Sequence, residues 1–276
     1  MGCFNSLREM VTAYQLTPQQ HLEAHAHCLA QGIAFCSTPF SIEEADLLDK
    51  LAVPFFKIAS MDIVHLALLK HVARKQRTVV ISTGMATLAE IEQAVETVRA
   101  EGNEQIVLLH CVSIYPPEYD TIHLRNIATL QQAFDVPVGF SDHTIGTAIP
   151  LAAISIGACI IEKHFTLDQE MAGWDHAISA SAEQLRTIVT EGRNIFAALG
   201  GYRRTVSAAE MEKRGKFRRS LVVRRNLETD HTLTEADLDA KRPGTGIAPN
   251  EITYVLGRRL ASGVAKDQVL HWKHLH

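Results

Sequence analysis

The chain has 276 residues, 46% of them hydrophobic, which is enough for one large domain and a small one. A formal net charge of −4 and a pI near 6.4 argue against a nucleic-acid-binding or membrane-surface protein. The N-terminus lacks a secretory leader pattern, and the most apolar stretch, 146–161, is too short to span a bilayer. We therefore expect a cytoplasmic protein without nucleic-acid or membrane partners.

Six apolar runs of strand length recur along the chain, and amphipathic helix patterns separate them. The runs are 32–38, 53–60, 77–83, 105–112, 136–142 and 159–165. Thr87 with Glu90 matches a capping box at the start of one helix pattern, and Ser181 is a candidate cap for the last. Continuous apolar strands that alternate with helices predict a parallel sheet. The strand ends repeat every ~22–30 residues, which favours a (β/α) barrel, with a doubly wound sheet as the alternative.

Each run is apolar until its C-terminal end, where it becomes polar. The polar residues are Thr38, Lys57, Ser60, Ser82, Thr83, His110, Ser141 to His143 and Glu162 to His164. In a barrel these strand ends meet at one mouth, which is where barrel active sites lie. The serine, acid and histidine within the stretch VPVGFSDHTIG, residues 136–146, are therefore predicted to face a reaction centre.

The number of strand–helix units falls short of a closed barrel, which needs eight. Residues 6–32 have the pattern of two helical pieces with no strand before them, so the N-terminal side lacks about two units. We predict an α/β fold, a (β/α)8 TIM-type barrel without about its first two units, over residues 1–200. Residues 201–217 are predicted to be a linker or a bridging helix, and 218–276, where short β-like runs alternate with turns, a small second domain.

Two histidines, His143 and His164, end neighbouring strands of the predicted sheet. Neighbouring strands run about 4.8 Å apart, so the two imidazoles could share one divalent metal ion, with carboxylate or water oxygens completing its shell. The alternative is that both rings bond to backbone groups where loops begin. Because strand side chains alternate, Lys163 should point away from the mouth if His164 points toward it.

Lys57 lies within an apolar run, which argues against a solvated surface lysine. Such a lysine could form a Schiff base with a carbonyl substrate, or hold phosphate and carboxylate groups as a point charge. Hydroxyl and amide groups at three successive strand ends, in STPF, IASMD and ISTG, could cradle an anion. Asp175, in the loop GWDHAIS, could cover the site, and Arg242, in the turn KRPGTG, is a candidate clamp for a carboxylate or sugar.

Nine short motifs carry a resemblance to a known family. They are FCSTPF, FKIAS, STGMATLAEI, LLHCVSIYP, GFSDHT, EKHFTLD, DHAIS, RRSLV and KRPGTGI, in this order. From about residue 15 to the C-terminus, the series resembles the sialic acid synthase (N-acetylneuraminate synthase, NeuB) family. The last two motifs resemble the start and middle of its C-terminal antifreeze-like (SAF) domain, which is small and rich in β structure.

The resemblance implies a transferase that joins phosphoenolpyruvate to an N-acylated mannosamine or related hexosamine through a new carbon–carbon bond. The products are a nine-carbon 2-keto sugar acid and phosphate. The implied cofactor is a divalent metal, typically manganese with magnesium or cobalt as alternatives, bound by His143 and His164. The residues that the resemblance assigns to phosphoenolpyruvate are Thr38, Lys57, Ser60, Ser82, Ser113 and Ser141.

The resemblance also assigns residues to the sugar and to a second subunit. Tyr115 and Asp175 match positions that hold the sugar. Asp62 matches an acid that would join Lys57 and the two histidines in the catalytic set. Arg242 matches an arginine that reaches into the partner subunit's site, so the resemblance implies a domain-swapped homodimer.

In the implied mechanism, the acceptor's aldehyde is polarised by the metal and attacked by C3 of phosphoenolpyruvate. The cation formed at C2 takes up water, and the tetrahedral intermediate expels phosphate. Lys57 and the hydroxyls hold the phosphate and carboxylate throughout, so Lys57 is an electrostatic ligand. The alternatives are an aldolase with Lys57 as its Schiff-base lysine, and a catalytically impaired fragment that only binds or dimerises.

The sequence also departs from the family. It lacks an EIG.NHNG-like and a K.Q-like segment, which lie on two further N-terminal strands and supply an essential acid and substrate contacts. Ser113 stands where some relatives carry asparagine, and Asp62 where glutamate is frequent. We expect an open barrel with weak or no activity and low solubility, because an unclosed parallel sheet exposes edges and core. A misassigned start codon or a truncated gene is the simplest explanation.

These motifs do not identify the acceptor sugar. The loop GWDHAIS, residues 173–179, is compatible with N-acetylmannosamine, its 6-phosphate, or the amino sugars that lead to legionaminic or pseudaminic acid.

Overall fold

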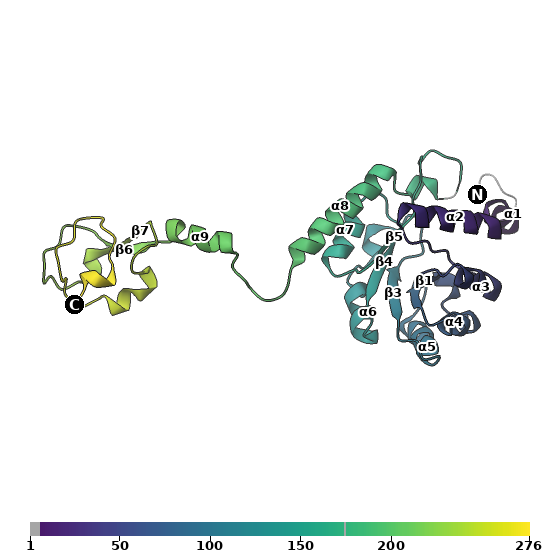
Figure 1. The fold of residues 1–276 in the computed structure, drawn as a ribbon, viewed down its shortest axis with the longest axis horizontal. Coiled ribbons are helices and arrows are strands. Elements are labelled where there is room, and N and C mark those ends of the chain that lie inside the picture. Colours follow the sequence, from purple (N-terminus) through teal and green to yellow (C-terminus); the bar gives the residue numbers. More distant parts are fainter. Residues whose placement is uncertain (1–5, 174) are drawn as a thin grey trace. The chain divides into compact units, whose positions relative to one another are not determined.

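The computed structural model describes residues 6–173 and 175–276, and it divides into two compact units, 1–200 and 201–276. Each unit has a hydrophobic core of its own (Figure 1). Among the described residues, no helix is both long and apolar enough to cross a membrane.

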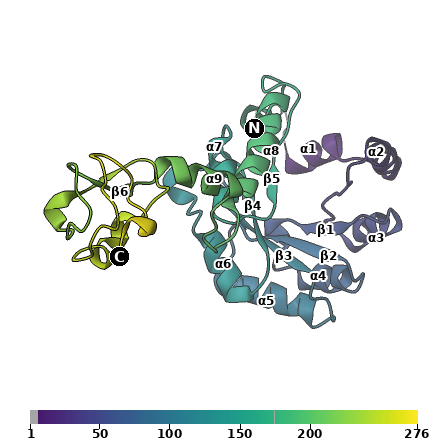
Figure 2. The same ribbon diagram turned by 60° about the vertical axis from the view of Figure 1, so that its left-hand side comes forward.

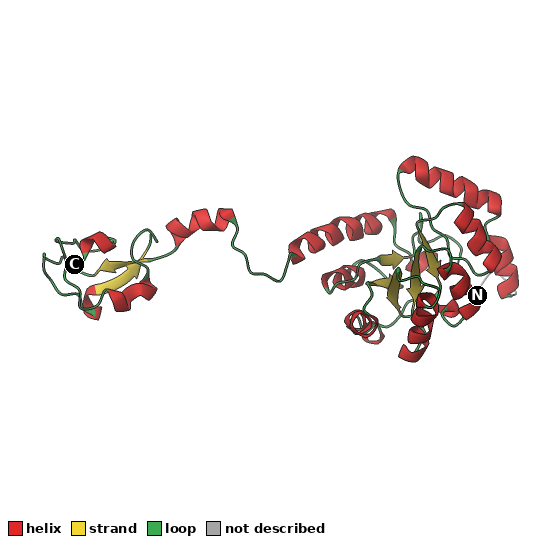
Figure 3. Ribbon diagram, turned by 60° about the horizontal axis from the view of Figure 1, so that its bottom comes forward, coloured by secondary structure: helices red, strands yellow, loops and turns green. Residues whose placement is uncertain are grey.

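The first unit is built from alternating helices and strands. Its helices are α1 (Leu7–Tyr14), α2 (Pro18–Gln31), α3 (Ile42–Lys50), α4 (Leu66–Ala73), α5 (Leu88–Arg99), α6 (Asn126–Phe134), α7 (Ala148–Ser155) and α8 (Ala182–Leu199). Its strands are β1 (Phe55–Ile58), β2 (Thr78–Ser82), β3 (Ile106–Cys111), β4 (Val138–Asp142) and β5 (Ile161–Lys163). The five strands are parallel and pair in chain order, with one of the helices α4 to α7 between each strand and the next. Figure 3 shows the strands inside a curved row of helices.

The sheet is strongly curved, and one contact demonstrates the curvature. In a flat sheet β1 and β5 would lie about 19 Å apart, because each of the four steps between strands adds about 4.8 Å. The Nζ of Lys57 on β1 nevertheless lies 3.3 Å from Oε2 of Glu162 on β5. The strands therefore form an arc of a barrel, as the repeat spacing predicts, and not the doubly wound alternative.

The core of this unit lies between the convex face of the sheet and the helices α3 to α7 (Figure 2). Phe56 of β1 and Phe140 of β4 are at most 2% exposed and belong to the same buried cluster as Leu69 of α4. Thr87 and Ser181 cap α5 and α8 with capping boxes, as predicted. The helices thus begin where local sequence specifies, and packing against the sheet holds them.

One predicted strand is absent from the sheet. Residues 33–39, which cover most of the apolar run 32–38, are extended but are not paired with β1. The Sγ of Cys36 lies 3.5 Å from the carbonyl oxygen of Phe55, so a thiol and not a backbone amide contacts the edge of β1 there. The sheet of the described residues has five strands, and the prediction of six is wrong in this respect.

Both edges of the arc are open. In the described sheet β4 is the only strand that pairs with β5, although a bridge joins Phe165, just beyond β5, to Ala180. An apolar cleft of about 470 Å³ lies between β5 and helices α7 and α8. Phe196 of α8, which lines this cleft, is 76% exposed, and Ile160 is 37% exposed. None of the residues of α2 is buried. The expectation of an open barrel with exposed edges and core is confirmed.

The second unit is small and rich in turns and β structure. It contains α9 (Ala208–Phe217) and two antiparallel strands, β6 (Ser220–Val223) and β7 (Leu238–Lys241). Leucine, isoleucine and valine side chains form its core. Most of the stretch predicted as a linker, 201–217, is the helix α9.

A buried carboxylate organises the second unit. Asp237 is 1% exposed, and its oxygens accept hydrogen bonds from Arg225 (2.8 Å), His231 (3.0 Å) and the amide and hydroxyl of Thr234 (3.0 and 2.7 Å). Burial alone would raise the pKa of Asp237, but these donors outweigh burial and hold the pKa below its usual range. The carboxylate therefore stabilises folding above the unfolded pKa of about 4, and this contribution is lost as the pH falls below that value.

We predict that Asp237→Asn lowers the free energy of unfolding of the second unit by about 2 kcal/mol at pH 7, because charge-assisted hydrogen bonds are lost. Below about pH 4 the wild type should lose stability more steeply than the variant. Urea denaturation of both proteins at a series of pH values, monitored through the amide exchange of β6, measures both effects.

Asp230→Asn is the matched control for this prediction. Asp230 lies 3.7 Å from Arg259, and both side chains are more than 60% exposed. Its replacement should change the free energy of unfolding by less than about 0.5 kcal/mol. Equal effects of the two substitutions would contradict the assignment of Asp237.

Candidate functional site

Side-chain alternation brings polar residues from the strand ends to the concave face of the sheet. Strand pairing aligns Cys111 with Ser141, and Ser141 with Glu162. Lys57 is aligned with the residue two positions before Ser82, so these two residues share the same face. We call Lys57, Ser82, Cys111, Ser141 and Glu162 the inner row.

Lys57 connects the first strand to the last within the inner row. Its Nζ donates to Ser82 Oγ at 2.7 Å and to the Ile58 carbonyl oxygen at 3.2 Å, and it lies 3.3 Å from Glu162 Oε2. The Oγ of Ser141 donates to Glu162 Oε1 at 2.7 Å. A Schiff-base lysine needs a neutral amine, whereas this amine is engaged by a carboxylate and a hydroxyl. The geometry favours an anion-binding lysine.

A group of hydroxyls and one amide, which we call the cradle, adjoins the inner row. It consists of Ser60, Gly84 and Ser113. The amide of Gly84 donates to Ser60 Oγ at 3.0 Å, and this oxygen lies 3.6 Å from the Sγ of Cys111. The Oγ of Ser113 lies 3.8 Å from the same sulfur. A Cβ at Gly84 would lie 2.2 Å from Ser113 Oγ and 2.7 Å from Ser60 Oγ. Only glycine leaves room for these hydroxyls, which together with loop amides suit the oxygen atoms of an anion.

Three rings, those of Tyr115, His143 and His164, form a cluster at the ends of β3, β4 and β5. The imidazole centroids are 5.2 Å apart, and the centroid of Tyr115 lies 4.1 Å from that of His143 and 5.7 Å from that of His164. The Nδ1 of His143 lies 3.0 Å from the Val112 carbonyl oxygen, and that of His164 lies 3.6 Å from Asp175 Oδ2. Burial lowers the pKa of both histidines, which favours the neutral form of each ring.

The two imidazoles provide part of a metal-ligand set. With each Nδ1 facing an oxygen, each ring keeps its Nε2 for another partner. In residues 6–173 and 175–276, no group of three or more His, Cys, Asp and Glu side chains is arranged to hold a metal ion. Two neighbouring imidazoles are a donor set that divalent transition-metal ions accept, so the residues present are compatible with the predicted ion.

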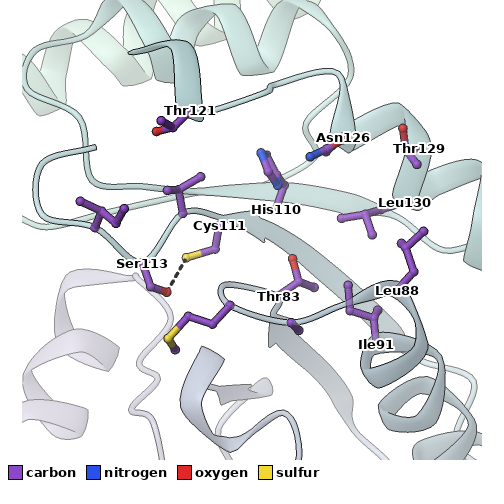
Figure 4. Close-up of a pocket in the computed structure, with 14 residues that line it drawn as sticks. Thr83, Leu88, Ile91, His110, Cys111, Ser113, Thr121, Asn126, Thr129 and Leu130 are labelled. Atoms are coloured by element: carbon purple, nitrogen blue, oxygen red, sulfur yellow. Dashed lines mark hydrogen bonds between the residues drawn. The ribbon is translucent and has the colours of Figure 1, made fainter. Parts of the chain in front are cut away.

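A cleft of about 450 Å³ opens beside Ser113 (Figure 4). Ser113 and Cys111 lie at one end of the cleft, and the side chains of Leu88 and Leu130 lie at the other. His110 lies between the two ends, and its Nε2 is 2.6 Å from a backbone carbonyl oxygen. The cleft thus joins one hydroxyl of the cradle to an apolar space beside it.

Three predicted site residues have other surroundings. Thr38 lines a cleft of about 450 Å³ at the starts of α2 and α3. Asp62, just after β1, lies 3.6 Å from His65 Nδ1, and its Oδ2 is buried without a hydrogen-bond partner among the described residues. Arg242 belongs to the second unit, where its guanidinium lies 5.5 Å from the ring centroid of Phe217. Their assigned roles stay predictions.

Glu162 and Gly84 lie in segments that the sequence predicts to face the site, but neither residue is assigned a role there. Lys163 is buried against Asp142, away from the inner row, as alternation predicts. The same alternation puts Glu162 on the side of His164, so the signal for Glu162 is present in the sequence. The motif ISTG contains Gly84, but the need for glycine at this position comes from hydroxyl groups on other strand ends.

Comparisons with known proteins agree with this geometry. The chain matches the model of the NeuB family over residues 2–204 and that of the SAF domain over residues 218–276. It is 38% identical to N,N'-diacetyllegionaminic acid synthase of Legionella pneumophila, over 97% of this chain and 76% of the relative. It is 37% identical to the Campylobacter jejuni protein of the same name, over 95% of this chain and 79% of the relative.

A solved structure shows the same fold. The crystal structure of N-acetylneuraminic acid (sialic acid) synthetase from Leptospira borgpetersenii in complex with citrate is 35% identical, with a TM-score of 0.71. The match covers 76% of this chain and 74% of that one. Family models and relatives of this identity together show that the chain belongs to the NeuB family and carries a C-terminal SAF domain.

Proposed function

We propose that this chain condenses phosphoenolpyruvate with an N-acylated hexosamine to give a nine-carbon 2-keto sugar acid and phosphate. The observation that carries the proposal is the Lys57 amine bonded to Ser82 and Glu162, on a sheet whose strand ends also carry a pair of neighbouring imidazoles. An anion site beside a site for a carbonyl oxygen is what the joining of these two substrates requires.

The relatives support the class of reaction and not one acceptor. Two are named for N,N'-diacetyllegionaminic acid, and the solved structure is named for N-acetylneuraminic acid. Because these names differ in their sugar, the proposal for this chain stops at an N-acylated hexosamine.

The phosphate and carboxylate of phosphoenolpyruvate would bind to Lys57, Ser82 and the cradle at Ser60 and Ser113. Lys57 supplies ammonium N–H donors from a side chain that is 11% exposed, and the anion would share them with Glu162 and Ser82. Gly84 supplies a backbone amide beside the hydroxyls. Because these donors are already in place, the anion binds with little reorganisation of the site.

Glu162 is the residue that we assign to proton transfer. C3 of phosphoenolpyruvate attacks the aldehyde carbon of the acceptor, and water then adds to the cation at C2. Ser141 and Lys57 fix the two oxygens of the Glu162 carboxylate, which can accept the proton that this water loses. Glu162 passes this proton to the alkoxide that the attack leaves on the acceptor. The bond between C2 and the phosphate oxygen then breaks, phosphate leaves with the bonding electrons and takes up the proton of the C2 hydroxyl, and C2 becomes the keto carbon.

The neutral rings of His143 and His164 would hold the divalent cofactor, with manganese as our first choice and magnesium or cobalt as alternatives. Such an ion supplies Lewis-acid polarisation of the acceptor's aldehyde oxygen. Tyr115 and Asp175 lie beside these rings, which supports the proposal that they hold the sugar.

Phosphate release from phosphoenolpyruvate tests the proposal. The purified chain would be assayed with manganese and a panel of N-acylated hexosamines, with His143→Ala as the control. We expect release that requires the sugar, the metal and His143, even at a low rate. Release that is independent of sugar, or equal in His143→Ala, would contradict the proposal.

The same assay tests the proposed swapped dimer. Arg242→Ala and His143→Ala should each be inactive alone. A refolded mixture of the two should recover about a quarter of the wild-type rate if Arg242 serves the site of a second copy. No recovery from two inactive variants would mean that Arg242 acts within its own chain, and an active Arg242→Ala variant would mean that Arg242 has no role.

Gly84→Ala should lower kcat/KM for phosphoenolpyruvate about 100-fold, because its methyl group would displace the hydroxyls of Ser60 and Ser113. Steady-state kinetics with phosphoenolpyruvate as the varied substrate measure this change. Gly201→Ala is the control, since a Cβ there meets no atom within 4 Å. Unchanged kinetics in Gly84→Ala would show that the cradle does not bind the substrate.

A further inference from the structure

A buried ion pair lies directly behind the two histidines. The Nζ of Lys163 on β5 is 2.8 Å from Oδ2 of Asp142 on β4, and the two side chains are 3% and 0% exposed. Asp142 and Lys163 are register partners, one position along from Ser141 and Glu162. The pair therefore lies on the opposite face of the sheet from the inner row, and no step proposed above uses it.

The contacts of this pair involve the residues on both sides of His143 in the chain. The Nζ of Lys163 also donates to the carbonyl oxygen of Thr144 at 2.5 Å, and Oδ1 of Asp142 accepts from the Thr144 amide at 2.9 Å. One ammonium group thus binds the residue before His143 and the residue after it. Because Lys163 directly precedes His164, the same group connects the backbone segments that carry both histidines.

The end of β5 is held by β4 on one side and by one bridge on the other. The strand has three residues, and in the described sheet β4 is its only strand partner. His164 follows the last residue that pairs with β4, and its carbonyl oxygen accepts a hydrogen bond from the Ala180 amide at 2.7 Å. Burying an ion pair carries a desolvation cost and often gives no more stability than an apolar pair. We therefore look for the role of this pair in how it fixes the positions of the backbone groups that it binds.

We propose that the Asp142–Lys163 pair is a positioning device that holds His143 and His164 at the spacing at which they share one divalent cation. The inference rests on the metal site proposed above. Asp142 and Lys163 are positioning residues, because they act on the backbone of the histidines from the opposite face of the sheet.

The test is manganese binding by a double variant of the full chain, Asp142→Asn/Lys163→Met. This variant removes both charges at once, leaves no buried charge unpaired, and keeps an acceptor for the Thr144 amide. Electron paramagnetic resonance of free manganese gives the affinity, and urea denaturation gives the stability. We expect the dissociation constant to rise about 10- to 100-fold. A folded variant that binds manganese as tightly as the wild type overturns the proposal.

Lys75→Met is the matched control. Lys75 is 10% exposed and lies 2.5 Å from Asp46, in an ion pair that involves no residue of the site. Its loss should leave the manganese affinity unchanged. His143→Ala should abolish the binding, which shows that the titration reports this site.

A second measurement separates this inference from the proposed metal site. Without manganese, amide exchange of residues 141–145 and 161–165 should be at least about tenfold faster in the double variant than in the wild type and Lys75→Met. Faster exchange in a chain that binds no manganese would reject the metal site and keep the positioning role. Unchanged exchange would reject the positioning role. If the double variant does not fold, Lys163→Arg, which keeps the charge and changes its reach, replaces it in both measurements.

Discussion

The contact between Lys57 and Glu162 is the constraint on which the candidate site depends. It joins the first strand of the sheet to the last, which requires the sheet to curve into an arc of a barrel. Ser82 and Ser141 supply the hydrogen bonds that a charge pair in such a place needs. The curvature of the sheet therefore brings the two charged groups together with the hydroxyls that bond to them. As a result, an ammonium, a carboxylate and two hydroxyls lie on one concave surface.

Alternation along β4 and β5 divides this end of the sheet into two layers. Ser141 and Glu162 face the concave side, and Asp142 and Lys163 lie behind them. The first layer carries groups that can meet a substrate, and the second ties the strand ends together. Such a division suits a strand of three residues, because groups that act on one face need a backbone that contacts on the other face hold in place.

Local patterns in the sequence account for much of the fold and of the site. The caps at Thr87 and Ser181 and the polar ends of β1, β2, β4 and β5 follow from residues a few positions apart. The run 32–38 was expected to form a strand, and it does not, because pairing depends on a neighbour that local sequence does not describe. The need for glycine at position 84 is also not evident from local sequence, because it follows from hydroxyls that distant segments bring close.

Calorimetric titration of phosphoenolpyruvate into the wild-type chain and Lys57→Met tests the central claim, that the curved strand ends form one anion site. Binding does not require turnover, so the result reports the concave face directly. We predict saturable binding to the wild type and an affinity at least about tenfold weaker in Lys57→Met, because charge-assisted hydrogen bonds are lost. Equal affinities in the two proteins would contradict the account.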